Sequence, residues 1–257
     1  MAESNPVQSA ERIFQIFETL AQNGPMTLTQ LSQSLGLHKT TAHRLTQSLV
    51  SMHYVKKDAV TGKYRLTFKI LELSGRVLEQ MDIRAIAHPY IERLASECRE
   101  TVHFVQREGS NIVYIDKVES NVNSVRMVSR VGLRQPMYCT AVGKAMLAEL
   151  PLEDVRELWD KSRLEKLTEN TITDFPLLQK ELALIREKGY ALDNEENELG
   201  VRCIAACVTG FDGKSVNAFS ISAPTTRMDD DRIRELSRYV LAVKKELSRE
   251  LGYTPRE

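Results

Sequence analysis

The sequence predicts an α+β protein in which a small helical domain with a β-hairpin precedes a larger domain built on an antiparallel sheet. Residues 27–66 carry the signals of a helix, a tight turn, a second helix and a hairpin, in that order. Residues 66–97 keep a helical spacing of apolar side chains. Beyond residue 100, apolar runs of strand length come in hairpin-like pairs with helices between them. A chain of 257 residues also exceeds one average domain.

Three helices are expected in the first domain. Apolar residues from Ala10 to Leu20 recur at helical spacing, and Asn23-Gly24-Pro25 ends this helix. Thr27 is well placed to cap a second helix, and Gly36 supplies the turn that follows it. The third helix is expected from about Lys39 to Met52, with its apolar side chains turned toward a shared core.

A hairpin and further helices complete this part of the chain. Tyr54-Val55 and Tyr64–Leu66 alternate like strands, and Asp58–Gly62 forms the tip between them. Leu66–Leu78 is again helical in pattern, and Asp82 is placed to cap a helix that runs through Glu97. The expected division is therefore 1–66 for the first domain, 67–82 for a helical linker and 83–257 for the second domain.

The second domain mixes strands and helices. The expected strands are Val102–Gln106, Ile112–Val118, Val125–Val131, Ile204–Val208 and Ala218–Ser222. The expected helices are Ala141–Leu150, Leu152–Asp160, Phe175–Lys188 and Asp229–Leu251, the last with an acidic first turn.

Charge is distributed unevenly along a chain that is neutral as a whole. Between His38 and Lys69 there are seven lysines and arginines against one carboxylate, Asp58, an excess of six positive charges in one block. The remaining chain must be acidic by the same amount. This pattern favours local binding to a polyanion over general adhesion.

The third helix and the hairpin have the composition of a winged helix-turn-helix that binds DNA. Positions 40, 43, 44 and 47 share one helix face, opposite the apolar side chains. Short polar and basic side chains near the start of such a helix reach base edges in the major groove, while lysines of the hairpin hold phosphates. Candidate DNA contacts are Thr27, His38, Lys39, Thr40, Thr41, His43, Arg44, Gln47, Lys56, Lys57, Lys63 and Arg65. The alternative is a winged helix that binds only protein, with a solvated basic face.

Other features of the sequence exclude several classes. Four scattered cysteines, Cys98, Cys139, Cys203 and Cys207, suit neither a disulfide framework nor a zinc site, so no metal or cofactor is expected. Gly143-Lys144 is not a phosphate-binding loop, because the upstream glycine and the following Ser or Thr are absent. No signal peptide or membrane-spanning run is recognisable, which predicts a cytoplasmic protein.

Several blocks of sequence resemble the IclR family of bacterial transcriptional regulators, in the same order and along nearly the whole chain. The blocks are LSQSLGLHKTTAHRLTQSL, a Tyr-Val wing with GKYRL, MYCTAVGKAMLAELP, GYALDNEENELGVRCIAACV and FSISAPTTRM. The family signature fits Gly189, Asp193, Glu196 and Cys203. One departure is that Thr209-Gly210 stands where the family usually has an aromatic-Asp pair, and Phe211-Asp212 follows two residues later.

The resemblance implies a GAF-like second domain that binds a small organic effector, a homodimer that often forms a tetramer on DNA, and repression of a catabolic operon. The stretch VRMVSRVGLRQPMYCTAVGK is most similar to members that sense 2-keto-3-deoxygluconate in sugar-acid catabolism. Effector contacts are implied at Met127, Ala141, Val142, Asp193, Cys203, Ser220 and Ser222. By linkage we expect the effector to favour one arrangement of the second domain, and the helical link near Leu71 to Asp82 to pass that preference to the paired winged helices, whose separation must match two half-sites.

Residue types alone also indicate a pocket for a small acid. Ser220 and Ser222 lie two apart on a strand, so both hydroxyls face one side, and the start of the helix at Thr140 offers backbone N–H groups to a carboxylate. Plainer alternatives are that both serines are exposed and that Asp193 belongs to a solvated acidic loop or caps a turn. A methionine such as Met127 is more often a core residue. Arg126 and Arg130 share a strand face that could meet an acidic ligand, but surface ion pairs are the favoured interpretation.

An enzyme is the competing class of function. Cys203 with a histidine such as His103, or the carboxylates Glu195 and Glu198, would be its best machinery. No Cys-His or Ser-His-Asp signature is present, and His88 and His103 are isolated. We therefore expect a regulator and not an enzyme.

Overall fold

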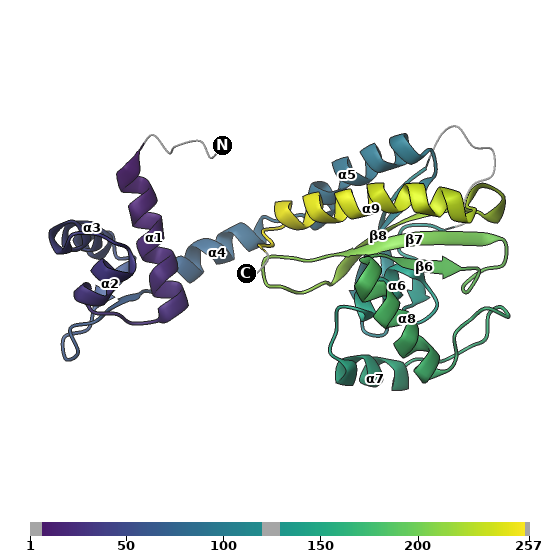
Figure 1. Cartoon of the computed structure of the whole chain (residues 1–257), viewed down its shortest axis with the longest axis horizontal. Coiled ribbons are helices and arrows are strands. Elements are labelled where there is room, and N and C mark those ends of the chain that lie inside the picture. The colour runs from purple at the N-terminus through teal and green to yellow at the C-terminus, as the bar shows by residue number, and fades with distance from the viewer. Residues whose placement is uncertain (1–6, 120–128, 255–257) are drawn as a thin grey trace. The chain divides into compact units, whose positions relative to one another are not determined.

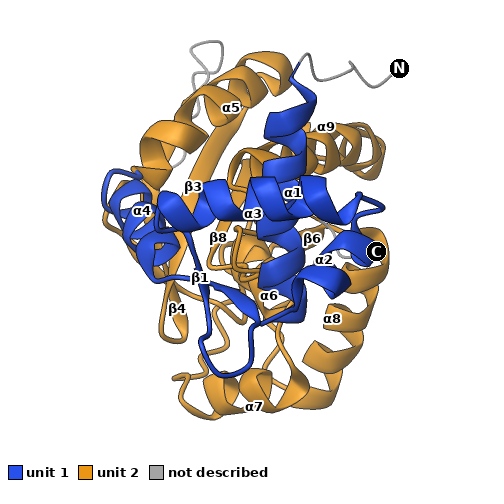
Figure 2. Ribbon diagram, turned by 90° about the vertical axis from the view of Figure 1, so that its left-hand side faces the viewer, with its two compact units in different colours: residues 1–81 blue, residues 82–257 orange. Residues whose placement is uncertain are grey.

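The structure is a computed structural model that describes residues 7–119 and 129–254 (Figure 1). The chain divides into two compact units, Met1–Met81 and Asp82–Glu257 (Figure 2). None of the helices in the described ranges is long and apolar enough to cross a membrane.

The first unit is a three-helix core with a hairpin and a further helix. Its elements in order are α1 (Gln8–Asn23), α2 (Leu28–Ser34), α3 (Lys39–Ser51), β1 (Val55–Lys57), β2 (Tyr64–Leu66) and α4 (Lys69–Glu79). The fully buried side chains that hold it together include Ile16, Leu31, Leu49 and Tyr64, one from each of four elements. The expected helix-turn-helix and wing are thus present, with boundaries that shift by a few residues.

Two local devices fix the ends of these elements. Thr27 caps α2 in a capping box, in which its hydroxyl accepts the Gln30 N–H and the Gln30 side chain accepts the Thr27 N–H. At the tip of the wing, the Asp58 carboxylate accepts the N–H groups of Val60 and Thr61, and Gly62 takes a φ of 67°. These hydrogen bonds fix the turn at the tip of the wing, and this turn fixes the register of β1 and β2.

The second unit contains a six-stranded antiparallel sheet in the order β5-β4-β3-β8-β7-β6. The strands are β3 (Thr101–Glu108), β4 (Asn111–Val118), β5 (Arg134–Pro136), β6 (Ala191–Asn194), β7 (Val201–Val208) and β8 (Asn217–Pro224). The helices are α5 (Ile83–Cys98), α6 (Ala141–Leu147), α7 (Leu152–Asp160), α8 (Phe175–Lys188) and α9 (Asp230–Glu250), with a short 3₁₀ turn, η1 (Thr225–Arg227).

Helices cover both faces of this sheet (Figure 1). One apolar core lies between the sheet and α5 and α9, and includes Phe104, Phe219 and Ile221. The other lies between the sheet and α6, α7 and α8, and includes Trp159 and Leu178. Because side chains alternate along β8, Phe219 and Ile221 enter the first core while Ser220 and Ser222 face the opposite side.

Several expectations for the second unit were wrong in detail. The helix expected over Ala141–Leu150 ends at Leu147. Strands β5 and β6 were not expected, because each is only three or four residues long and lies beside turn or acidic sequence. The strand expected over Val125–Val131 falls mostly outside the described residues, and its described part, residues 129–131, is not a strand.

Candidate functional site

The polar face of α3 is open to solvent. Thr40, His43, Arg44 and Gln47 are exposed, while Ala42, Leu45 and Leu49 are buried in the core of the first unit. Burial of that apolar face orients α3, and the exposed face is the one expected to enter a DNA groove. His38 is the residue before α3 and Lys39 is its first residue, both exposed, with Thr41 half-buried.

The wing presents its cations in a defined register. Lys56 and Arg65 are directly paired across the hairpin and exposed, whereas Val55 and Tyr64 point into the core. Lys57 lies over the Tyr64 ring at 5.6 Å, and Lys63 is half-buried beside the tip. The strands therefore direct their basic side chains outward and their apolar ones inward.

The cations of α3 and the wing are not neutralised within the part of the chain that the structure describes. There, Lys39, Arg44, Lys56, Lys57, Lys63 and Arg65 have no carboxylate oxygen within 4 Å. A surface of unpaired cations attracts a polyanion and exchanges its counterions for phosphates. Thr27, in contrast, already uses its hydroxyl to cap α2.

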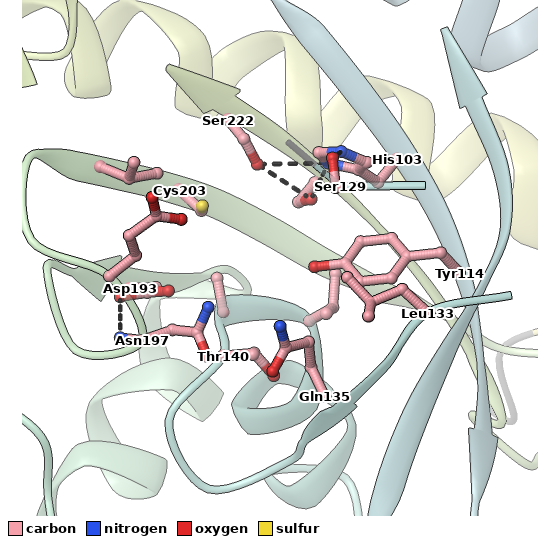
Figure 3. Close-up of a pocket in the computed structure, with 15 residues that line it drawn as sticks. His103, Tyr114, Ser129, Leu133, Gln135, Thr140, Asp193, Asn197, Cys203 and Ser222 are labelled. Carbon is pink, nitrogen blue, oxygen red and sulfur yellow. Dashed lines mark hydrogen bonds between the residues drawn. The ribbon is translucent and has the colours of Figure 1, made fainter. Parts of the chain in front are cut away.

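A polar cavity of about 250 Å³ opens beside the sheet of the second unit (Figure 3). It brings together the start of α6 and one side of strands β3, β4, β6, β7 and β8. Its lining consists of His103, Tyr114, Ser129, Leu133, Gln135, Thr140, Ala141, Val142, Asp193, Asn197, Glu198, Val201, Cys203, Ser220 and Ser222. Six of the seven expected effector contacts are among them, and the seventh, Met127, lies outside the described residues.

The alternatives that the two serines are exposed and that Asp193 is solvated were wrong, although Asp193 does cap backbone N–H groups as the other alternative for it expected. Ser220, Ser222 and Asp193 are 4%, 3% and 4% exposed. Asp193 and Cys203 are register partners on β6 and β7, inside the sheet and not merely beside a loop. The six residues that follow Asn194 form the connection that closes one wall of the cavity.

Asp193 is held by the connection it precedes. Its Oδ1 accepts the N–H of Glu196 at 2.7 Å and that of Asn197 at 3.3 Å. Burial raises the pKa of Asp193 to about 7, although these hydrogen bonds and nearby Lys144 oppose the rise. This carboxyl therefore changes between neutral and charged near neutral pH, in direct contact with the cavity.

His103 lines the cavity, although the sequence indicated it only as a histidine that could act with Cys203 in an enzyme and not as an effector contact. It lies on β3, 2% exposed, with Nε2 at 2.6 Å from the Ser129 hydroxyl. Its Nδ1 lies 3.3 Å from the Ser222 hydroxyl and 3.4 Å from that of Ser220. Its position in the apolar run VHFV could have indicated that His103 is buried, because a strand covered on both faces buries every side chain that it carries.

The start of α6 forms the floor of the cavity and is packed very closely. A Cβ added to Gly143 would lie 2.3 Å from the Cα and O atoms of Met137, so only glycine permits this approach. The Thr140 hydroxyl accepts the Gly143 N–H and donates to the Pro136 carbonyl. Because α6 has only seven residues, its dipole is weaker than expected for the longer helix that the sequence indicated.

A buried ion pair lies behind the floor. Lys144 is fully buried, and its ammonium contacts Glu196 and, at 3.3 Å, Glu181. This pair was not expected from the sequence. A single lysine inside the small apolar helix AVGKAML was the signal that could have indicated it.

The residues suggested for an enzyme have other roles. Burial, followed by the charge of Asp193, raises the pKa of the Cys203 thiol, so it is not a reactive thiolate. Glu195 accepts the Gly200 N–H at 2.7 Å and closes the connection between β6 and β7. Among the residues that the structure describes, no cluster of histidine, cysteine and carboxylate groups could hold a metal ion.

A winged helix with an exposed cationic face, joined to a domain with a buried polar cavity, defines a DNA-binding regulator that carries its own ligand-binding domain. Comparison with known proteins is consistent with this class. The family profile for the IclR helix-turn-helix domain matches residues 9–59. The profile described as bacterial transcriptional regulator IclR C-terminal matches residues 75–249. The chain belongs to the IclR family of bacterial transcriptional regulators, which are DNA-binding proteins and not enzymes.

Similar proteins cover nearly the whole chain. The HTH-type transcriptional regulator KdgR of Escherichia coli is 34% identical over 251 residues, which are 98% of this chain and 95% of KdgR. The DNA-binding transcriptional repressor YiaJ of Escherichia coli is 37% identical over 254 residues, 97% of this chain and 90% of YiaJ. The crystal structure of Thermotoga maritima IclR matches with a TM-score of 0.65 and 32% identity, and covers 95% of this chain and 99% of that one.

Proposed function

We propose that this regulator is a cytoplasmic repressor that holds an operator through α3 and the wing and releases it when a small acid binds the cavity. The observation that carries the DNA-binding part is the exposed cationic face of α3 and β1–β2, whose charges have no carboxylate partner among residues 7–119 and 129–254. In this proposal Arg44 reads a guanine and Gln47 an adenine, while Thr40 or Thr41 meets a phosphate or a thymine methyl. The remaining candidates contact the phosphate backbone of the DNA: the turn at Thr27, His38, Lys39, His43, Lys56, Lys57, Lys63 and Arg65.

Substitution of Arg44 tests base reading directly. Operator sequences are first selected from random duplex DNA with the full chain. Arg44→Ala should then lose about 1–3 kcal/mol of binding free energy on the selected site and little on random duplex, because a base contact is sequence-specific. Equal loss on both DNAs would make Arg44 a phosphate contact. Arg163→Ala, an exposed arginine in the second unit, is the control.

The proposed effector is a sugar acid or keto acid from a catabolic route, as the likeness to members that sense 2-keto-3-deoxygluconate suggests. In this proposal it contacts Ala141, Val142, Asp193, Cys203, Ser220 and Ser222, with Met127 as a further contact. The cavity supports a small hydroxylated ligand because hydroxyl, amide and carboxyl groups line it together. Its described lining contains no lysine or arginine, so an acid would be held by hydrogen bonds and by a protonated Asp193.

The two serines provide the test of the effector site. Thermal shift against a panel of sugar acids and keto acids identifies a ligand for the full chain. The double variant Ser220→Ala/Ser222→Ala should bind that ligand with lower affinity, while its affinity for DNA stays unchanged. Retained effector affinity would remove the serines from the site. Ser237→Ala, a half-buried serine of α9 that does not line the cavity, is the control.

We propose that a second copy of this chain covers the apolar surface of α4. None of the eleven residues of α4 is buried within its own unit. Ile70, Leu73 and Val77 follow the three- and four-residue spacing of a helix-helix seam, and α1 adds Phe14 and Phe17 to the apolar groove beside it. A pair of winged helices would then match half-sites about 34 Å apart, or a multiple of that.

Oligomeric state tests this surface. Light scattering should give a dimer or tetramer for the native chain and a monomer for Leu73→Asp/Val77→Asp. A dimer that survives both charges would contradict the assignment of α4. The effector would act through this pairing. It can change operator affinity only to the extent that it binds one arrangement of the two paired winged helices more tightly than another.

A further inference from the structure

The side chain of His103 is fixed from several directions at the cavity wall (Figure 3). Its strand, β3, pairs with β4 on one side and β8 on the other, and places His103 directly opposite Ser220. The Tyr114 ring meets it edge-on, with centroids 5.0 Å apart. Hydroxyl groups of three serines surround its two nitrogens. The imidazole is therefore a preorganised group and not a mobile surface side chain.

The imidazole is also uncharged. Burial, together with the charge of Lys117, lowers the pKa of His103 to about 3. A neutral imidazole has one donor and one acceptor nitrogen, so it offers no positive charge to a carboxylate. The His103 side chain is therefore poorly suited to hold the acid group of a ligand.

The hydroxyls of Ser220 and Ser222 compete for one nitrogen of His103. Nδ1 has one position for a hydrogen bond, yet the hydroxyls of Ser220 and Ser222 both lie within 3.4 Å of it. The two hydroxyls are 3.5 Å from each other, which is a weak contact. A ligand hydroxyl can donate and accept at once, and so it completes the set whichever serine bonds to the imidazole.

We propose that His103, acting with Ser220 and Ser222, is a specificity-determining residue that reads a hydroxyl group of the effector and thereby selects hydroxylated acids over unsubstituted ones. This inference rests on the proposed function of the cavity as the effector site. A site built around a ligand hydroxyl rejects an analogue that lacks it, because buried polar groups are then left unpaired.

Two probes with the same head group separate hydroxyl reading from acid binding. 2-Keto-3-deoxygluconate carries a hydroxylated chain on a keto-acid head, and pyruvate carries the same head with only a methyl group. Isothermal titration of the full chain measures both. His103→Phe keeps a ring of similar shape. It should lower the affinity for 2-keto-3-deoxygluconate by about tenfold or more and the affinity for pyruvate by less than about threefold. His103→Gln, which keeps polar atoms, should recover part of the loss.

Controls separate the possible failures. His88→Phe replaces a half-exposed histidine on α5, outside the cavity, and should change neither affinity. Should His103→Phe not fold, Ser222→Ala is a milder change that must show the same selective loss. Equal loss on both probes, or no loss on either, would overturn the role of His103 and leave the effector site standing. Failure of the native chain to bind either probe would instead overturn the proposed effector class.

Discussion

The buried ion pair of Lys144 offers the sharpest test of how the cavity is held together. Its ammonium is fully buried between Glu196, on the connection that closes the cavity, and Glu181 on α8. Lys144→Met keeps the length of the side chain and removes the charge. Glu196, only 7% exposed at its side chain, is then left as an uncompensated carboxylate with its Oε2 atom already lacking a partner in the described structure.

The expected cost is large. Breaking a buried pair by removing one partner costs about 3–5 kcal/mol of unfolding free energy. With a urea dependence of about 2 kcal/mol per molar, the midpoint should fall by roughly 2 M. The cost should be smaller at pH 5 than at pH 8, because burial already raises the pKa of Glu196 and loss of the lysine raises it further, so acid neutralises the orphaned group.

The chain provides its own local probe for this experiment. Trp159 is the sole tryptophan, lies in the core formed by α6, α7 and α8, and packs on Phe175. Its fluorescence therefore follows unfolding of the second unit in the full chain. Lys161→Met removes an exposed lysine that pairs with Glu157, and should leave the midpoint where it is.

A double variant decides whether the charge is responsible. Lys144→Met/Glu196→Met replaces the pair with apolar side chains and should recover most of the lost stability, since a buried pair is often exchangeable for apolar packing. Additive losses in the double variant, or a single-variant loss of less than about 1 kcal/mol, would refute the reasoning from an uncompensated charge.

Four further outcomes follow from named residues. The pKa of Asp193 in the folded protein is raised from 3.8 to about 7, so the stability that its protonation contributes is complete below pH 3.8 and is lost as the pH rises through 7. Asp193→Asn should therefore flatten the decline of the unfolding free energy with pH in urea titrations. An unchanged pH profile would contradict the raised pKa. For the same reason, affinity for an anionic effector should fall by up to about tenfold per pH unit above 7 in calorimetry, whereas a pH-independent affinity would exclude Asp193 as the protonated partner. Gly143→Ala should cost about 3 kcal/mol or more, because its Cβ meets the Met137 backbone, and a neutral result in thermal unfolding would show that α6 shifts freely. Lys56→Ala/Arg65→Ala should reduce the slope of log affinity against log salt by about two, equally on any duplex, and an unchanged slope would place the wing away from phosphate.

The exposed cationic face of α3 and the wing was readable from the sequence because its signals are local. Helical spacing, the Thr27 cap, the turn at Gly36 and the alternation around Lys56 and Arg65 each depend on neighbours within a few residues. Strand alternation likewise placed Ser220 and Ser222 on one face correctly.

The rest of the cavity depends on contacts between distant segments. His103 and Ser129 are 26 residues apart, and Lys144 and Glu196 are 52 apart. Strand β6 is recognisable only through its pairing with β7, because its own four residues lead into an acidic run. Sequence periodicity contains no information on which buried groups meet across a sheet, so these partners required the fold.

Affinity of the full chain for its selected operator, measured by fluorescence anisotropy at several salt concentrations with and without 2-keto-3-deoxygluconate, tests the central claim most directly. We expect a steep linear fall of log affinity with log salt, and weaker operator binding at each salt concentration when the acid is present. An operator affinity that does not depend on salt, or that is unchanged when saturating acid is bound, would contradict a cationic winged helix whose DNA binding is controlled by the cavity of the second unit.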